Sequence, residues 1–281
     1  MSAAPAYDFA NILFAGPCNR RCPWCIGEQL PGSVNRNNLD EFPPRGLDAL
    51  VDEVNRWGVR DVVLTGTVTD PQLYAHERAL IDLLRARLHE GARLSLHTNG
   101  ALALRKLDAF NAYDRATLSI PSLCSATYSR MMGATHVPDL AAIVRAATIP
   151  VKVSCVLDAP NVTELDDFLA CCADMGVRRV VLRRLFGETR RWQILPGRQP
   201  VAWFKGNPVF EVLGMEVSYQ DFHDATFRSL NLFADGTLGR SYRLTETTEL
   251  GLGADVVTAR AERSGGSRPG AQSHSPPVPR S

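Results

Sequence analysis

The stretch Cys18-Asn19-Arg20-Arg21-Cys22-Pro23-Trp24-Cys25 decides how this chain is interpreted. It places three cysteines in a C-x3-C-x2-C spacing, directly after an apolar segment, residues 11–15, that predicts a strand. Three thiolates packed this closely can bind three irons of a cubane [4Fe–4S] cluster and leave the fourth iron without a protein ligand. An open iron is a place where a small molecule can bind and be reduced.

Other uses of the cysteine triplet have to be weighed against a cluster. A structural zinc site needs four ligands, usually in paired knuckles, and the sequence has no second C-x2-C spacing. The remaining four of the seven cysteines are scattered: Cys124, Cys155, Cys171 and Cys172. We expect these four to be structural thiols. A non-catalytic iron–sulfur or zinc protein, with the triplet as a structural or redox-sensing site, stays open as the alternative.

The composition narrows the class of protein. The chain has 281 residues, of which 45% are hydrophobic and 22% charged, enough for one large domain or two small ones. Its net charge of +1 gives no clear signal for nucleic acid or an anionic membrane. We find no apolar stretch near the roughly 20 residues of a membrane-spanning helix, and residues 1–10 lack a secretory signal pattern. We therefore expect a cytoplasmic protein.

Strand and helix patterns alternate after the triplet. Six strands are predicted, at residues 11–15, 60–65, 92–98, 115–120, 151–157 and 177–185. The helices predicted between them lie at residues 45–57, 72–89, 101–110, 139–147 and 163–175. This alternation favours an α/β fold with a parallel sheet and right-handed crossovers. Six repeats fit either an open doubly wound sheet or a partial barrel.

The triplet, with the aromatic Trp24 before its last cysteine, resembles the signature of the radical S-adenosylmethionine (radical SAM) enzymes. The resemblance covers roughly residues 10–187 and implies a partial (β/α)6 barrel. The early layout is similar to that of the molybdenum-cofactor cyclases, but no second cysteine triplet follows, so a compact single-cluster member is expected. The implied cofactors are a [4Fe–4S] cluster, held by Cys18, Cys22 and Cys25, and S-adenosyl-L-methionine.

The pattern changes after the sixth predicted strand. Residues 187–205 are rich in Arg, Gly and Pro and predict a loop, while residues 215–222 and 229–238 predict antiparallel strands with a turn at Asp235-Gly236. Beyond about residue 253 apolar residues nearly vanish, which is typical of disorder. We therefore predict a barrel core at residues 1–187, a C-terminal extension at 188–250 that closes the barrel, and a disordered tail at 251–281.

The resemblance also implies contacts to S-adenosyl-L-methionine. Trp24 would lie against the adenine, or would only cover the cluster from water. After the second strand, the family usually has a Gly-Gly-Glu-Pro-like segment that holds the amino group of the cofactor. Here the segment starts at Gly66-Thr67 and lacks the glutamate, so the backbone of these two residues is the expected contact. Asp70 is a possible substitute for the glutamate, or a helix cap.

Later strand ends supply the other implied contacts. Thr98 and Asn99, in a Thr-Asn-Gly turn, are expected at the mouth of the barrel, and the neighbouring His97 is more often a core residue in such a position. Ser119 and Ser122 would approach the ribose and carboxylate. Ser154 and Asn161 loosely resemble residues that contact the cofactor in relatives, and Asn161 suits a turn at least as well.

An arginine cluster after the sixth strand points weakly to an anionic substrate, because arginine binds carboxylate and phosphate groups through two parallel hydrogen bonds. Its members are Arg183, Arg184, Arg190, Arg191 and Arg198. Local ion pairs, for example with Glu188, are the plainer interpretation.

The resemblance implies a reaction but no particular substrate. The cluster would cleave S-adenosyl-L-methionine reductively to a 5′-deoxyadenosyl radical, which would abstract a hydrogen from a small molecule, a nucleotide-like molecule or a peptide. The expected partner is an electron donor such as a flavodoxin or ferredoxin. The catalytic residues after hydrogen abstraction are unknown, and Cys124 and Cys155 are candidates to return a hydrogen atom.

Overall fold

Parallel strands form the centre of the structure. The computed structural model describes residues 7–221 and 224–239, within a compact unit that spans Met1–Leu244. Its central strands follow the order of the sequence, and each pairs in parallel with the next. They are β1 (Phe9–Phe14), β2 (Asp61–Gly66), β3 (Arg93–Thr98), β4 (Arg115–Ser119), β5 (Val151–Leu157) and β6 (Arg179–Arg184). All six predicted strands are confirmed, in the order of a partial (β/α)6 barrel.

Further strands extend the sheet at both edges. At one edge β10 (Ser229–Leu232) pairs in parallel with β1 and antiparallel with β11 (Leu238–Gly239), across the predicted turn at Asp235-Gly236. At the other edge β9 (Met215–Gln220) pairs in parallel with β6 and continues antiparallel through β8 (Asn207–Val212) to β7 (Ala202–Phe204). Within the described residues the sheet has eleven strands and is unclosed, because it ends at β11 and β7.

This arrangement corrects one detail of the sequence analysis. Antiparallel strands are present at the C-terminus as predicted, but β9 and β10 lie on opposite sides of the six-stranded core and do not pair with each other. Each runs parallel to the core strand that it borders. An open parallel core leaves unpaired backbone groups at both of its edges, and these two strands satisfy one edge each.

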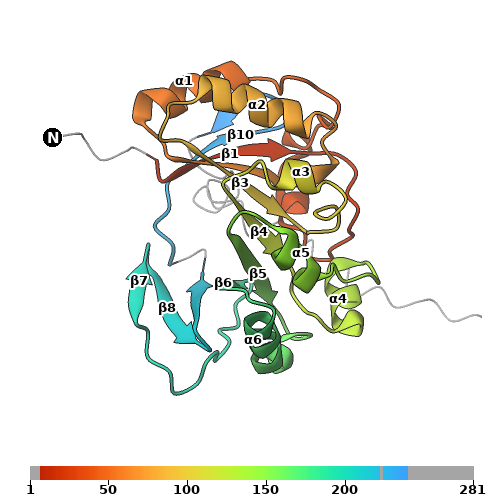
Figure 1. Ribbon diagram of the computed structural model, residues 1–281, viewed down its shortest axis with the longest axis vertical. Helices are drawn as coiled ribbons and strands as arrows, with labels where there is room; N and C mark the ends of the chain where they lie inside the picture. Colours follow the sequence, from red (N-terminus) through yellow and green to blue (C-terminus); the bar gives the residue numbers. More distant parts are fainter. Residues whose placement is uncertain (1–6, 222–223, 240–281) are drawn as a thin grey trace, which may run out of the picture. The chain divides into compact units, whose positions relative to one another are not determined.

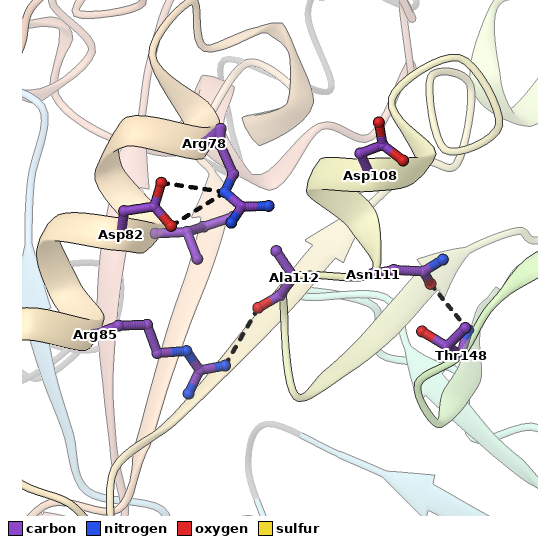
Figure 2. Close-up of a pocket in the computed structure, with 8 residues that line it drawn as sticks. Arg78, Asp82, Arg85, Asp108, Asn111, Ala112 and Thr148 are labelled. Carbon is purple, nitrogen blue, oxygen red and sulfur yellow. Dashed lines mark hydrogen bonds and ion pairs between the residues drawn. The ribbon is translucent and has the colours of Figure 1, made fainter.

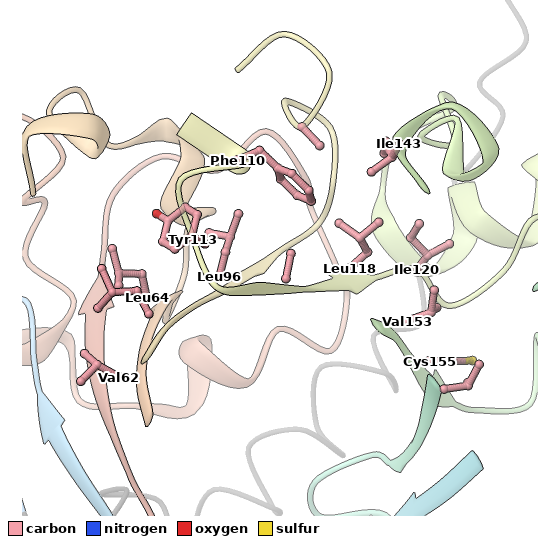
Figure 3. Packing of buried hydrophobic residues seen from close by; sticks show 14 of the residues in the cluster. Val62, Leu64, Leu96, Phe110, Tyr113, Leu118, Ile120, Ile143, Val153 and Cys155 are labelled. Atoms are coloured by element: carbon pink, nitrogen blue, oxygen red, sulfur yellow. The ribbon is translucent and has the colours of Figure 1, made fainter. Parts of the chain in front are cut away.

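Helices cover one face of the parallel strands (Figure 1). They are α1 (Leu47–Trp57), α2 (Glu77–Arg87), α3 (Leu107–Phe110), α5 (Leu140–Ala146) and α6 (Leu165–Asp174). Each turns an apolar stripe to the sheet; in α1 the stripe is Leu47, Leu50, Val51 and Val54. Figure 3 shows the resulting layer, where Phe110 of α3 and Ile143 of α5 lie near Leu96 and Leu118 of the sheet.

The two faces of the strands differ in chemistry. The face toward the helices, here the outer face, carries the apolar residues of the main core: Ala10, Ile12, Phe14, Val62, Leu64, Leu94, Leu96, Ala116, Leu118, Val153, Cys155, Leu157, Val180, Leu182 and Val217. The alternate residues form the opposite or inner face, and most are polar: Asn11, Asp61, Thr65, Arg93, Ser95, His97, Arg115, Thr117, Ser119, Lys152, Ser154, Arg179, Arg183, Glu216, Ser218 and Gln220. The inner face is therefore not the second hydrophobic layer of a doubly wound sheet.

Several helical segments differ from their predicted bounds. The helix expected at 72–89 begins at Glu77, because a 3-10 helix, Pro71–Leu73, capped by the Asp70 carboxylate, precedes it. The segment 101–106 forms turns, so only α3 is helical there. Lys106, at the end of these turns, donates to Gln72 O at 2.5 Å and to Glu77 Oε2 at 2.9 Å.

Other elements were not predicted at all. Helix α4 (Ser125–Met132) has a buried face at Tyr128, Met131 and Met132, a spacing that could have indicated it, and it ends at the left-handed Gly133. The segment 187–205, expected as a loop, includes β7. The predicted tail, 251–281, lies outside the described residues, and the proposed division into core, extension and tail stays a prediction.

Candidate functional site

The cysteine loop, residues 15–25, follows β1 at the edge where the parallel strands end. Helix α4 holds one side of it. Arg21 N donates to Met132 O at 2.9 Å, Arg20 Nε donates to the Tyr128 hydroxyl at 2.9 Å, and a side chain at Gly133 would come within 2.4 Å of Arg21 O. The helix that the sequence analysis missed is thus one support of the cysteine loop.

The ends of β2 and β3 hold the other side of the loop. Thr69 Oγ1 donates to Pro17 O at 2.7 Å. A β-carbon on Gly27, just after the last cysteine, would lie 2.2 Å from Thr67 O, so only glycine lets the two backbones meet this closely. From β3, Asn99 Nδ2 donates to Asn19 Oδ1 at 2.7 Å, between the first two cysteines.

The three thiols are free and differ in exposure. Cys18 is exposed, while Cys22 and Cys25 are half-buried. Cys25 Sγ donates to Thr67 O at 3.5 Å, and Cys22 Sγ lies 3.6 Å from Met132 Sδ. Burial raises the pKa of all three thiols, and the neighbouring Cys25 and Cys18 help to raise that of Cys22 to about 12. The thiols are therefore protonated at neutral pH unless a metal displaces the proton.

The donor set fits a cluster better than a single ion. In the part of the chain that the structure describes, no three His, Cys, Asp or Glu side chains are grouped closely enough to hold one metal ion. A cubane cluster spreads its ligands over several irons, so three free thiols on one loop are a donor set that suits it.

The other four cysteines are placed elsewhere. Cys155 is buried and its thiol donates to Pro121 O at 3.4 Å, and Cys172 is buried in the core beside the exposed Cys171 of α6. Cys124 is exposed at the start of α4, where the backbone N–H groups of Thr127 and Ala126 lower its pKa.

Among the expected cofactor contacts, Gly66 and Thr67 lie directly against the cysteine loop. Gly66 ends β2 in a turn so tight that a β-carbon would be 1.8 Å from Thr69 O. The Thr67 N–H and hydroxyl both donate to Phe14 O, at 2.8 and 3.2 Å. The Thr67 carbonyl faces the Cys25 thiol, so this backbone offers an acceptor, not a donor, next to the cysteines.

Asp70 forms the helix cap that the sequence analysis gave as one possibility. Its buried carboxylate accepts from Gln72 N at 3.0 Å, from Thr98 Oγ1 at 2.9 Å and from Asn99 N at 2.6 Å. Burial raises the pKa of Asp70, and these donors oppose that shift. Thr98 and Asn99 are buried as well, and their side chains bond to Asp70 and to Asn19.

The three serines expected to contact the cofactor differ in whether their hydroxyls are already hydrogen-bonded within the protein. Ser119 is exposed at the end of β4, next to Ser154 in register, and has no side-chain hydrogen bond to the residues that the structure describes. Ser122 is buried and donates to Glu164 Oε2 at 2.7 Å. Ser154 is buried and accepts from Arg183 Nε at 2.9 Å.

Two further residues expected to contact the cofactor make contacts within the protein instead. Asn161 is buried and donates to Pro121 O and Val156 O, the turn role foreseen for it. Trp24 is half-buried and packs against the main core.

The predicted arginine cluster is mostly paired within the protein. Arg184 forms a buried ion pair with Asp221 at 2.6 Å, and Arg190 pairs with Asp158 and Glu188. Arg191 lies 3.9 Å from Asp224, and Arg198 donates to Glu211 O. Only Arg183 is on the inner face, where its charge acts on Lys152 and His97, which the sequence analysis had not connected with it.

An open depression of about 600 Å³ lies away from the cysteine loop, between α2, α3 and Thr148 (Figure 2). Most of its polar groups are already engaged: Arg78 with Asp82, Arg85 with Ala112 O, and Asn111 Oδ1 with Thr148 N. It lies in the helix layer and brings no chemically reactive group to the cysteines.

The fold and the cysteine loop define the class of protein. The family model of the radical SAM superfamily matches residues 12–167. The chain therefore belongs to the radical SAM superfamily of enzymes, which implies an iron–sulfur cluster and S-adenosylmethionine as cofactors. No curated protein matches the chain. In the part of the chain that the structure describes, the helices are too short or too polar to cross a membrane.

The solved structures that the chain is similar to belong to longer chains. Streptococcus suis SuiB bound to its precursor peptide SuiA is 16% identical, with a TM-score of 0.49 over 63% of this chain and 40% of that chain. The enzyme anSMEcpe with bound AdoMet is 15% identical, with a TM-score of 0.46 over 66% of this chain and 55% of that one. Coproporphyrinogen III oxidase (HemN) from Escherichia coli is 16% identical, with a TM-score of 0.46 over 64% and 45%. The chain thus spans about half or less of their lengths.

Proposed function

We propose that this chain binds a [4Fe–4S] cluster through Cys18, Cys22 and Cys25 and uses S-adenosyl-L-methionine to remove a hydrogen atom from an anionic substrate. The observation that supports it best is the set of three free thiols on one loop at the carboxyl edge of a parallel sheet. When bound, such a cluster supplies the electron that cleaves S-adenosyl-L-methionine to methionine and a 5′-deoxyadenosyl radical.

The residues around the cysteines would hold and orient the cofactor. The Thr67 carbonyl, which Gly66 and Gly27 allow to approach the loop, would accept a hydrogen bond from the amino group of S-adenosyl-L-methionine. The exposed Ser119 hydroxyl would hydrogen-bond to the ribose or the carboxylate of S-adenosyl-L-methionine. Trp24 would shield the site from water.

Other expected contacts would act indirectly. Thr98, Asn99, Ser122 and Ser154 already bond to protein groups, so we assign them the positioning of the loops and of Arg183. Because Cys18 is the exposed thiol, we expect the electron donor, a flavodoxin or ferredoxin, to approach from its side. The cytoplasmic location stays a prediction.

The test is release of 5′-deoxyadenosine by the anaerobically reconstituted protein with S-adenosyl-L-methionine and dithionite, read by mass spectrometry. We expect release from the parent chain and none from Cys22→Ala. The matched control is Cys171→Ala, which removes an exposed thiol on α6 and should leave both iron content and release unchanged. Release that persists in Cys22→Ala would refute the assignment.

A second variant tests the backbone contact at the loop. Gly27→Ala forces a β-carbon to 2.2 Å from Thr67 O, whereas Gly32→Ala, with no atom within 4 Å, is its control. We expect Gly27→Ala to lower both iron content and 5′-deoxyadenosine release more than about tenfold, since active sites lose activity steeply with displacements of about 1 Å. Equal behaviour of the two variants would show that the close approach is not needed.

A further inference from the structure

The inner face carries more positive than negative charge. On β2 to β6 and β9 its cations are Arg93, Arg115, Lys152, Arg179 and Arg183, and its carboxylates are Asp61 and Glu216. The two carboxylates are already used: Asp61 pairs with Arg93 and Arg115, and Glu216 pairs with Arg179. Lys152 and Arg183 therefore have no ion-pair partner among the described residues.

Arg183 is oriented in a way that leaves its binding edge open. Its Nε donates to the buried Ser154 hydroxyl at 2.9 Å, which fixes the plane of the guanidinium. The two terminal nitrogens have no hydrogen-bond partner in residues 7–221 and 224–239. These nitrogens form a fork that matches the two oxygens of a carboxylate or phosphate.

Lys152 and His97 lie on the same face of the sheet as Arg183, whose charge helps to lower the pKa of both. Lys152 is two residues before Ser154 on the same strand and therefore shares its face, and Thr117 lies between Lys152 and His97 in register. Burial and the nearby Arg183, Arg179 and Arg115 lower the pKa of Lys152 to about 8. Burial and the same kind of cationic neighbours lower the pKa of His97, so the ring is neutral and can donate a hydrogen bond.

Unpaired cations that are partly removed from water cost free energy, and a bound anion offsets that cost. We infer that Arg183, Lys152 and His97 bind an oxyanion group, a carboxylate or phosphate, of the substrate. This inference rests on the proposed function and gives its substrate a chemical class.

The three residues differ in depth along their strands, because Arg183 and His97 are each one residue from the carboxyl end and Lys152 is not. Lys152 is the second residue of β5, so it lies roughly 17 Å along the strand from the carboxyl end, at a rise of about 3.3 Å per residue. The hydrogen bond to Ser154 draws Arg183 back in the same direction. The cysteine loop follows the carboxyl ends of the strands. An oxyanion held by all three residues would therefore lie between the depth of Lys152 and the carboxyl edge that carries the cysteine loop.

The test uses the full-length reconstituted protein and two probes, inorganic phosphate and acetate, titrated by calorimetry at low ionic strength. Arg183→Gln and Lys152→Gln should each weaken binding of the preferred probe about tenfold, the effect of one lost charge-assisted hydrogen bond. Arg78→Gln, on the helix side of the sheet, is the matched control and should change nothing. Which probe binds tighter tells phosphate from carboxylate.

Further measurements separate loss of the anion site from misfolding and from loss of cofactor binding. Arg183→Lys keeps the charge without the fork and should recover part of the lost affinity, while circular dichroism checks that each variant is folded. The affinity for S-adenosyl-L-methionine should stay within about twofold of the parent in every variant. Probe affinity that is the same in all variants, or probe binding by none, would overturn the inference. A parallel loss of S-adenosyl-L-methionine affinity would also overturn it, by assigning the cations to the cofactor carboxylate.

The two proposals can fail separately. If 5′-deoxyadenosine is released but anion binding ignores Arg183 and Lys152, the substrate class is wrong and the function stands. If anion binding depends on these residues but no 5′-deoxyadenosine forms, the proposed function is wrong and the anion site stands.

Discussion

The outer and inner faces of the sheet are made by the same strands and have opposite properties. In β4, Ala116 and Leu118 are buried under the helices, while Thr117 and Ser119 point to the inner face. In β5, Val153 and Cys155 alternate with Lys152 and Ser154 in the same way. The outer face supplies the hydrophobic free energy of folding, and the inner face carries groups that lower stability and can bind a ligand.

The largest expected difference between the faces comes from neighbours on one strand. Leu118→Ala should lower the free energy of unfolding by about 3 kcal/mol, because it leaves a cavity in a fully buried layer. Ser119→Ala, one residue on, should change it by less than about 0.5 kcal/mol. Urea unfolding measures both. Similar losses would mean that the inner face is packed as tightly as the outer one.

An exception on the outer face gives the next largest effect. Thr98 follows Leu96 on that face but is polar, and its hydroxyl donates to the buried Asp70. Thr98→Val keeps the shape and removes a donor from a buried carboxylate, so it should cost about 1.5 to 3 kcal/mol. Chemical denaturation of the variant checks this. A neutral result would show that Gln72 N and Asn99 N satisfy Asp70 without Thr98.

On the inner face, removal of a cation should stabilise the protein. Lys152→Met keeps the apolar stem but removes a charge whose burial is unfavourable, so the free energy of unfolding at pH 7 should rise by about 1 kcal/mol.

The pH dependence of that gain has a definite sign. Between pH 8 and 10.5 the unfolded chain keeps the Lys152 proton that the folded protein has lost, so the stability of the parent rises with pH there relative to the variant. The advantage of Lys152→Met should shrink through this window and vanish above it, as urea titrations at several pH values would show. If the difference in free energy of unfolding between the variant and the parent did not change with pH, the Lys152 ammonium would be solvent-exposed.

The smallest effect is expected outside both faces. Arg78 and Asp82 pair on the exposed side of α2, with 61% and 58% of their side chains accessible. Arg78→Gln should cost about 0.5 kcal/mol or less, and salt should reduce even that. A loss as large as that of Thr98→Val would mean that the depression between α2 and α3 matters for stability.

Much of the fold could be predicted from the pattern of apolar residues. The six parallel strands appeared as predicted because each carries a short apolar or alternating run bounded by turn residues. The alternation in β3 to β5 could also have decided between a partial barrel and a doubly wound sheet, since the latter has strands that are apolar on both faces. Helix α4 was missed although its buried residues have helical spacing.

The candidate site also has features that the sequence predicts and features that need the tertiary structure. The cysteine triplet is a local spacing and needs no tertiary information. The arginine cluster misled, because five neighbours in sequence have different partners in space, and only Arg183 faces the same side as Lys152. Arg183 and Lys152 come from neighbouring strands, and the register of these strands sets Arg183 opposite Val156.

The amino-acid sequence by itself determined the thiol triplet, the parallel α/β core and the family, because spacing and periodicity are local properties of the chain. Only the tertiary structure decided that β9 and β10 extend opposite edges, that α4 supports the cysteine loop, and that Asp70 is enclosed by its donors. It also decided which cations remain without a carboxylate. The physical reason is that hydrogen bonds and ion pairs depend on distance in space, and strand pairing brings together residues far apart in the chain.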